Sequence, residues 1–150
     1  MSFSLTGGTT ASIVQGAPAT LDAAGFGALT YVKIGEIESY SAFGNTANLS
    51  PFTSVDDSLE RQEVGSVSAG TLTLTCALDE ADAGQAICDA AVDTTDPSFR
   101  SDFSLEIVLP SGTIVYYLCK ISSSTIEPAD VNAVIRSTIT LPLNSNKVVV

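Results

Sequence analysis

"GTLTLTCALDEADAGQAICDAAV", residues 70–92, contains the two patterns that decide the fold. Over residues 71–78, apolar side chains alternate with threonine, which is typical of a strand that buries one face. Over residues 83–91, alanine and isoleucine recur at the three- and four-residue spacing of a helix face. We therefore expect a strand that leads directly into a short helix. Asp79 is the predicted cap of that helix, and Asp82 stands three residues later, where a capping-box acid would lie.

The four residues Asp79-Glu80-Ala81-Asp82 also spell the DEAD box of ATP-driven RNA helicases. Such an enzyme needs a phosphate cradle of the type GxxxxGK[ST], and the chain contains no Gly-Lys pair. It also needs cations for phosphates and nucleic acid, whereas this chain has 6 Lys plus Arg against 17 Asp plus Glu, for a net charge of -11. The sequence therefore excludes an ATP motor and favours a capped helix.

The composition indicates a single domain whose surface is partly covered by a partner. The length of 150 residues fits one domain. Only 15% of the residues are charged and 45% are hydrophobic, while typical domains are about 25% charged. A weakly charged surface often meets a partner. We expect no signal peptide and no membrane insertion, because no cationic start precedes an apolar core and no apolar run is long enough to span a bilayer.

The reactive residue types argue against metal and cofactor chemistry. The chain has no histidine, the commonest metal ligand and general base, and its three cysteines lie far apart in the sequence. We expect Cys76, Cys88 and Cys119 to be free thiols in a reducing compartment and to act as small buried hydrophobes. Two acidic pairs, Asp56-Asp57 and Glu36/Glu38, are candidates for carboxylate catalysis. A solvated acidic surface is the simpler interpretation of both pairs.

Further strand patterns flank the opening stretch. Residues 103–109, "FSLEIVL", alternate, and the turn "PSGT" predicts a hairpin to residues 114–121, "IVYYLCKI". The latter strand is apolar on both faces, so it should be central or covered by the helix. A last strand is expected near residues 131–141. An earlier strand begins at Val32 and carries a predicted bulge at Gly35-Glu36.

Two segments show no sustained period. Residues 1–30 are rich in Gly, Ala, Thr and Ser, which predicts an arm that is ordered late or by neighbours. Residues 44–65 combine a proline and many turn formers with scattered apolar residues, which predicts a long functional loop and not a solvated linker.

These patterns predict a mainly β fold, a β-sandwich or partly open barrel of two packed antiparallel sheets. One short α-helix, at about residues 80–92, flanks the sheets, and the long loop spans about residues 44–65. We expect one domain over residues 1–150, with an N-terminal arm at 1–30, a core at 31–143 and a C-terminal tail at 144–150.

The order of these elements resembles the major tail tube proteins of long-tailed, siphovirus-like bacteriophages. The resemblance covers roughly residues 17–145, and "DEADAGQ" and the "LPSG" turn are its most specific details. The matching pieces are "YVKIGEIESY" (31–40), "VGSVSAGTLTLTCALDEADAGQAICDAA" (64–91), "FSLEIVLPSGTIVYYLCKISSS" (103–124) and "VIRSTITLPLNS" (134–145).

The resemblance implies a structural subunit of a virion tail and not an enzyme. In such proteins six copies form a ring, their inner sheets join into one barrel around a channel, and the rings stack into a tube. Tail terminator, tape measure and baseplate or tip proteins would be its partners, and assembly would take place in the host bacterial cytoplasm. DNA would pass through the channel without specific binding, and an acidic wall suits this passage because a cationic wall would hold phosphate.

The resemblance and the alternation together suggest two sets of functional residues. The channel-facing set is expected from the polar side of the inner sheet: Glu36, Glu38, Thr71, Thr73 and Thr75. The inter-subunit stacking set is expected from the long loop: Asn48, Leu49, Phe52, Val55, Asp56, Asp57, Leu59 and Arg61. The arm and the tail would contact neighbouring rings.

Two other classes of protein share some of these features. A β-sandwich binding or adhesion module would have similar strand content, but it would normally expose aromatic residues and be secreted. This chain has no Trp and only 4 Tyr. A carboxylate enzyme is the weakest alternative, because nothing near the acidic pairs in the sequence suggests a desolvating pocket.

Overall fold

The computed structural model of the chain describes residue 3 and residues 5–150. The strands and helices within this part are named here in chain order. They are β1 (Thr10–Gln15), α1 (Ala23–Gly27), β2 (Val32–Ile34), β3 (Ile37–Tyr40), β4 (Thr46–Thr53), β5 (Glu60–Ser68), β6 (Thr71–Ala77), α2 (Ala83–Ala91), β7 (Phe103–Val108), β8 (Ile114–Cys119), β9 (Ser123–Glu127), β10 (Arg136–Pro142) and β11 (Val148–Val149).

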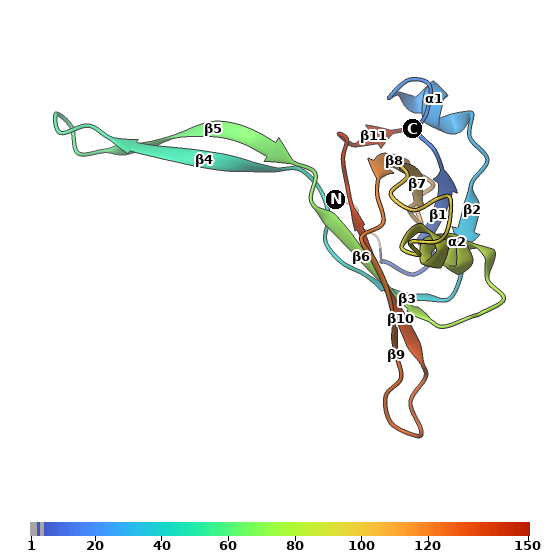
Figure 1. Cartoon of the computed structure of the whole chain (residues 1–150). Helices are drawn as coiled ribbons and strands as arrows, with labels where there is room; N and C mark the ends of the chain where they lie inside the picture. The colour runs from blue at the N-terminus through green and yellow to red at the C-terminus, as the bar shows by residue number, and fades with distance from the viewer. Residues whose placement is uncertain (1–2, 4) are drawn as a thin grey trace.

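Two antiparallel sheets pack face to face in the body of the molecule. Within the described residues, the larger sheet has the strand order β11-β8-β7-β1-β2 and the smaller one has the order β3-β6-β10-β9. Helix α2 packs against β1 and β2 and flanks the sheets (Figure 1). The prediction of a mainly β sandwich with a flanking helix is confirmed.

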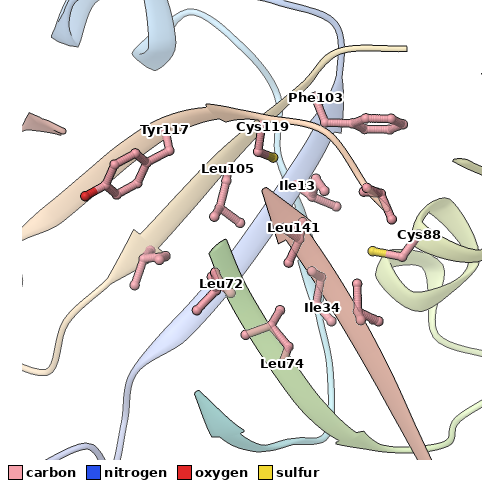
Figure 2. Packing of buried hydrophobic residues seen from close by; sticks show 14 of the residues in the cluster. Ile13, Ile34, Leu72, Leu74, Cys88, Phe103, Leu105, Tyr117, Cys119 and Leu141 are labelled. Atoms are coloured by element: carbon pink, nitrogen blue, oxygen red, sulfur yellow. The ribbon is translucent and has the colours of Figure 1, made fainter. Parts of the chain in front are cut away.

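The core lies between the two sheets and is built from the apolar sides of alternating strands. In β6, Leu72, Leu74 and Cys76 are fully buried, while the intervening threonines face away from the core. Leu105 in β7 and Ile139 in β10 are equally buried. Figure 2 shows Leu72, Leu74 and Leu105 gathered with labelled side chains of β1, β2, β8 and α2, including the thiol of Cys88. Strand alternation thus supplies most of this core.

The predicted hairpin between β7 and β8 is confirmed. The Leu109 N–H donates to the Thr113 carbonyl at 2.9 Å, and Gly112 closes the turn with a φ of 93°, which glycine adopts readily. Strand β8 is covered on its outer side, although by α1 and not by α2. Tyr116 stacks there on Phe26 of α1, with 5.3 Å between ring centroids and 8° between planes.

The predicted N-terminal arm and C-terminal tail are wrong for the most part. Strand β1 lies inside the larger sheet between β7 and β2, with Ala11 and Ile13 fully buried. Helix α1 follows, so the chain contains a second helix that its sequence did not indicate. At the other end, β11 pairs with β8 in the register Val148↔Tyr116. The structure of both ends depends on pairing with strands far away in the sequence, which local periodicity does not report.

The predicted long loop is also wrong, because β4 and β5 form a two-stranded antiparallel ribbon over most of residues 44–65. The ribbon projects from the body (Figure 1), and nearly all of its side chains are exposed. A ribbon that buries neither face needs no alternation of apolar and polar residues, so the strand signal was missing.

Candidate assembly surfaces and channel face

The outer face of the smaller sheet is a ladder of hydroxyl side chains. Thr73 and Thr75 of β6 lie in register with Thr140 and Thr138 of β10. Strand β9 extends both rows, with Ser123 opposite Thr140 and Thr125 opposite Thr138. The predicted alternation of β6 is confirmed, since Thr71, Thr73 and Thr75 all point away from the core.

A short row of charges crosses the same face at its far end. The guanidinium of Arg136 donates to both carboxylate oxygens of Glu38, at 2.6 and 3.3 Å. Ala77 is the register partner of Arg136, and its small side chain leaves room for the arginine to reach β3 across β6. On the other side of Arg136 lies its partner Glu127, which accepts a hydrogen bond from Thr138 at 2.8 Å. The only cation of this face is therefore held between two carboxylates, as far as the described residues show.

The Arg136 hydrogen bond lowers the pKa of the Glu38 carboxyl, so this acid remains ionised well into the acidic range. Sequence reasoning placed Glu38 on the polar face but did not identify its partner, which is 98 residues away. Glu127 was missed entirely, since no sequence signal connects it to this face.

Glu36 lies outside the sheet, in the connection between β2 and β3. Its backbone adopts a left-handed φ of 59°, and its carbonyl accepts from the Ala77 N–H at 2.9 Å. Glu36 and Glu38 were expected on the same face because side chains alternate along a strand. Glu36 does not lie in a strand, so this expectation does not hold for it. Its exposed side chain lines a small hollow with Thr10, Lys33 and Tyr40.

All eight residues predicted for the stacking loop lie on the β4–β5 ribbon or at its tip. They are Asn48, Leu49, Phe52, Val55, Asp56, Asp57, Leu59 and Arg61. The register pairs Leu49↔Val64 and Ala47↔Val67 put four apolar side chains on one face of the ribbon near the body. Leu49 and Val64 are 55% and 67% exposed. Apolar side chains on a projecting ribbon with two bare edges indicate a surface that a partner covers.

The tip of the ribbon is a structured turn. Asp57 forms an ion pair with Arg61 at 2.7 Å, and this contact lowers the pKa of the Asp57 carboxyl. Asp57 also accepts from the Leu59 N–H at 3.0 Å, while the Asp56 N–H donates to Ser54. The Asp56-Asp57 pair is thus solvated, with one member neutralised by arginine. Such a pair lacks the desolvated setting of a general acid.

The "DEADAGQ" stretch forms a structural junction, and here the predicted cap is one turn too early. Asp82, and not Asp79, caps α2: its carboxylate accepts from the Gln85 N–H at 2.9 Å and from the Gly35 N–H at 3.1 Å. Asp79 instead accepts from the nearby Ala81 N–H. The local pattern could not choose between two acids three residues apart, because the contact with Gly35 is tertiary.

Gln85 completes the junction. Its buried side chain accepts from the Asp79 N–H and donates to the carbonyls of Gly35 and Ala77, all at 3.0–3.1 Å. Three backbone segments are joined through one amide. This explains the stretch in structural terms, without any nucleotide chemistry.

The described residues contain no group of three or more His, Cys, Asp or Glu side chains placed to hold a metal ion. Cys76, Cys88 and Cys119 are free and buried in the core, and burial raises the pKa of each thiol. In the part of the chain that the structure describes, no helix has the length and apolarity that crossing a membrane requires.

A family profile and a set of solved structures both match the chain. The profile of the family described as "Phage tail tube protein, TTP" matches residues 2–150. No curated protein sequence matches the chain.

Several solved structures share the fold over nearly the whole chain. A chain of the anti-feeding prophage baseplate superposes with a TM-score of 0.69 and 11% identity, over 100% of this chain and 97% of that one. A chain from the tail of an empty gene transfer agent particle gives a TM-score of 0.60 and 15% identity, over 92% of each chain. The SPP1 tail tube gives a TM-score of 0.61 and 13% identity, over 94% of this chain and 75% of that one. At these identities the likeness shows a common fold.

Proposed function

Because the chain belongs to the family of phage tail tube proteins, whose members are structural subunits and not enzymes, we propose that six copies form a ring and that rings stack into the tube of a phage-like tail. The family match over residues 2–150 is the observation that carries this proposal. Six-fold order is named for two of the similar structures, the anti-feeding prophage baseplate and the tail of the gene transfer agent.

The edges of the smaller sheet support a ring. Strands β3 and β9 are its two outermost strands, and each presents one side to solvent. Exposed edges of this kind invite pairing with another chain. If β3 of one copy lies beside β9 of the next, six small sheets close into one barrel and the bare edges disappear. The hydroxyl ladder then lines the channel, because its opposite side is the core.

The charges on the smaller sheet suit the passage of DNA. Glu38 and Glu127 outweigh Arg136, so this row contributes one net negative charge per copy. The salt bridge to Glu38 occupies Arg136, the one cation on this face among the described residues, which could otherwise bind phosphate. A channel lined by threonine and a small excess of carboxylate binds DNA only weakly, because it has few cations to contact the phosphates. We assign Glu38, Thr71, Thr73 and Thr75 to this wall, with Glu127 added from the structure, and we place Glu36 near the rim.

The β4–β5 ribbon is the proposed stacking element. Its strands are eight and nine residues long, so it extends about 27 Å from the body at the usual rise per residue. This reach is enough to contact a neighbouring subunit, and its apolar face gains from being covered.

The remaining proposals concern location and partners. Residues 1–150 act as one tail-tube domain of a virion tail, assembled in the host bacterial cytoplasm. Solved relatives are named with a sheath, a tube terminator, a cap and a baseplate. By analogy we propose a terminator and a baseplate or tip protein at the two ends of this tube, and a tape measure protein inside it during assembly.

Electron microscopy of the purified protein over a range of concentrations tests the proposal. We expect six-fold rings and stacked tubes. Monomers at every concentration, or rings of another symmetry, would contradict it.

A further inference from the structure

Cations are scarce in this chain, and their positions are informative. Of its 6 Lys and Arg residues, Arg61, Lys120 and Arg136 form ion pairs within the described part of the chain. Arg100 forms none among the described residues, and its guanidinium lies over the ring of Phe99, 5.0 Å from the centroid. Arg100 is thus an exposed cation in a protein with a net charge of -11.

Arg100 lines a mostly apolar pocket of about 380 Å³. The pocket lies where the C-terminal end of α2 meets the segments before β7 and after β8. Its lining includes Ala91, Phe99, Arg100, Lys120, Ile121 and Pro142. Lys120 contacts Asp102 at 2.8 Å and donates to the Arg100 carbonyl. The site therefore combines a mostly apolar lining with the guanidinium of Arg100, which forms no ion pair among the described residues.

The backbone at Arg100 is also unusual. Its φ of 66° lies in the left-handed region, which is strained for a residue other than glycine. This conformation fixes where the side chain leaves the backbone and directs it over Phe99. The guanidinium accordingly lies over the Phe99 ring, beside the pocket that both residues line.

The tip of the β4–β5 ribbon has the complementary chemistry. Val55 is 97% exposed and Leu59 is 59% exposed, so two apolar side chains stand at the end of the ribbon. Asp56 follows Val55 directly. Its neighbour Asp57 is already paired with Arg61, which leaves Asp56 as the carboxylate available to a partner. The exposed Val55 next to the Asp56 carboxylate is complementary to an apolar pocket next to the Arg100 guanidinium.

We propose that the ribbon tip of one copy docks into this pocket of a second copy, with Val55 in the apolar part and Asp56 against Arg100. The inference rests on the proposed tube and names a contact that holds it together. Figure 1 shows the ribbon leaving the body on the side away from α2, whereas the pocket lies at α2. Donor and acceptor surfaces on opposite sides of one molecule cannot satisfy each other within that molecule. They form a head-to-tail contact, which repeats from copy to copy.

The hairpin between β9 and β10 is a second segment that could occupy the pocket. It carries Asp130 next to Val131, which is 98% exposed. Its two strands, however, belong to the smaller sheet that lines the proposed channel. The ribbon is a separate two-stranded sheet that reaches outward. We therefore assign the pocket to the ribbon tip, and the experiment below includes the other hairpin as an alternative.

A charge exchange tests the contact. Arg100→Asp should raise the concentration needed for tube formation by about tenfold or more, since each of many repeated contacts loses an ion pair and gains a repulsion. Adding Asp56→Arg to the same chain should restore most of the loss. Lys33→Asp, which changes the net charge equally at an exposed side chain of β2, is the matched control and should leave tube formation close to wild type.

Cross-linking locates the contact directly. A chain carrying Val55→Cys is mixed with a chain carrying Ser101→Cys, and the assembled sample is oxidised. We expect a disulfide-linked pair of the two chains, identified by mass spectrometry of the joined peptides. The native thiols are buried and burial raises the pKa of Cys76 to about 11 and that of Cys119 to about 12, so they stay protonated and do not compete.

The outcomes separate this inference from the proposed function. If wild-type protein forms six-fold tubes but Arg100→Asp assembles normally and no link joins residues 55 and 101, the docking is wrong and the tube stands. Rescue of Arg100→Asp by Asp130→Arg, and not by Asp56→Arg, would give the pocket to the β9–β10 hairpin and also overturn the inference. If wild-type protein forms no tubes or rings at all, the proposed function fails and this contact with it.

Discussion

At the residue scale, Gly84 at the start of α2 constrains how closely that helix packs against the larger sheet. Gly84 lies so close to β2 that a Cβ placed on it would be 2.4 Å from the Lys33 carbonyl oxygen and 2.7 Å from the Ile34 Cα. Both neighbours are backbone atoms, and backbone atoms in a sheet give way less readily than a side chain. The absence of a side chain at Gly84 therefore sets the distance between α2 and the larger sheet.

This close approach leads to a stability prediction. Gly84→Ala should lower the free energy of unfolding by about 1–3 kcal/mol, because the helix must move away from β2. Gly27→Ala is the control, since nothing lies within 4 Å of a Cβ at that position; it should be neutral or stabilising by up to about 1 kcal/mol. Urea unfolding of both variants measures the difference. Equal stability of the two would show that α2 is not pressed against β2.

Glu38 gives a prediction on pH dependence. Its carboxyl has a pKa lowered from 4.5 by Arg136, so the ion pair is fully present at neutral pH and is lost as the pH falls through the lowered value. Wild type should therefore have a higher Tm than Glu38→Gln at pH 7, and the difference should shrink as the pH falls through the lowered pKa of Glu38. Other groups at this contact are Glu127 and Thr138, which both variants keep.

Thermal unfolding followed by circular dichroism at several pH values provides the measurement. Glu80→Gln changes the same charge at an exposed position, and it should show no such pH-dependent difference. A gap between wild type and Glu38→Gln that persists unchanged at the lowest pH would mean that the Arg136 contact contributes nothing.

At the level of whole elements, the β4–β5 ribbon should be dispensable for folding and essential for assembly. Its side chains from Asn48 to Val67 are exposed in the subunit, apart from the partly buried Ser54, and add nothing to the core between the sheets. Replacing residues 50–63 by Asn-Gly joins Leu49 to its register partner Val64 through a two-residue turn. The shortened chain should unfold within a few degrees of wild type and should form no tubes.

Deleting residues 47–60 alone would be a poorer test, because it would remove β4 and leave β5 without a partner. Microscopy and thermal unfolding of the register-matched variant check both expectations. Normal polymerisation of that variant would remove the stacking role from the ribbon, and a large loss of stability would show that the ribbon contributes to the folded subunit.

A strand could be predicted from the sequence when it buries one face of apolar side chains in the core. Strands β6, β7 and β10 pack one face against the core, so their apolar residues alternate and the sequence identified them. Strand β1 contributes two buried side chains, one of them only an alanine, Ala11, which is too weak a signal. The ribbon buries neither face in the subunit, so apolar and polar residues do not alternate in its sequence. Its structure reflects strand pairing alone, with burial left to a partner.

In the whole molecule, the parts that sequence could not supply are contacts between distant segments. The pair Glu38–Arg136 joins residues 98 positions apart, and Gln85 reaches Gly35 across 50. The larger sheet is completed by strands from both ends of the chain, β1 and β11. The threonines of the candidate channel face could be predicted from the alternation of apolar and polar residues in β6. The neutralisation of its arginine and the place of Glu127 required the three-dimensional pairing of β3, β6, β10 and β9.

That face leads to a prediction for the assembled tube. Glu38→Lys combined with Glu127→Lys changes the row formed with Arg136 from one net negative to three net positive charges per copy. Both positions are exposed, so the subunit should fold, and six-fold repetition would build cationic rings along the channel. Wild-type tubes should not retain DNA. Tubes of the double variant should bind it, more strongly at low salt than at high salt, because bound phosphate releases counterions.

Co-sedimentation of preformed tubes with short duplex DNA at two salt concentrations makes the comparison. Glu60→Lys with Glu63→Lys alters the net charge by the same amount on the ribbon, outside the proposed channel. A second control uses DNA attached to beads that are too large to enter the channel. An outer surface should bind bead-attached DNA as well as free DNA, whereas a channel should bind only the free DNA. If the ribbon variant retains DNA as well as the sheet variant does, or if bead-held DNA binds equally, the threonine face does not line the channel, although the chain would still form the tube.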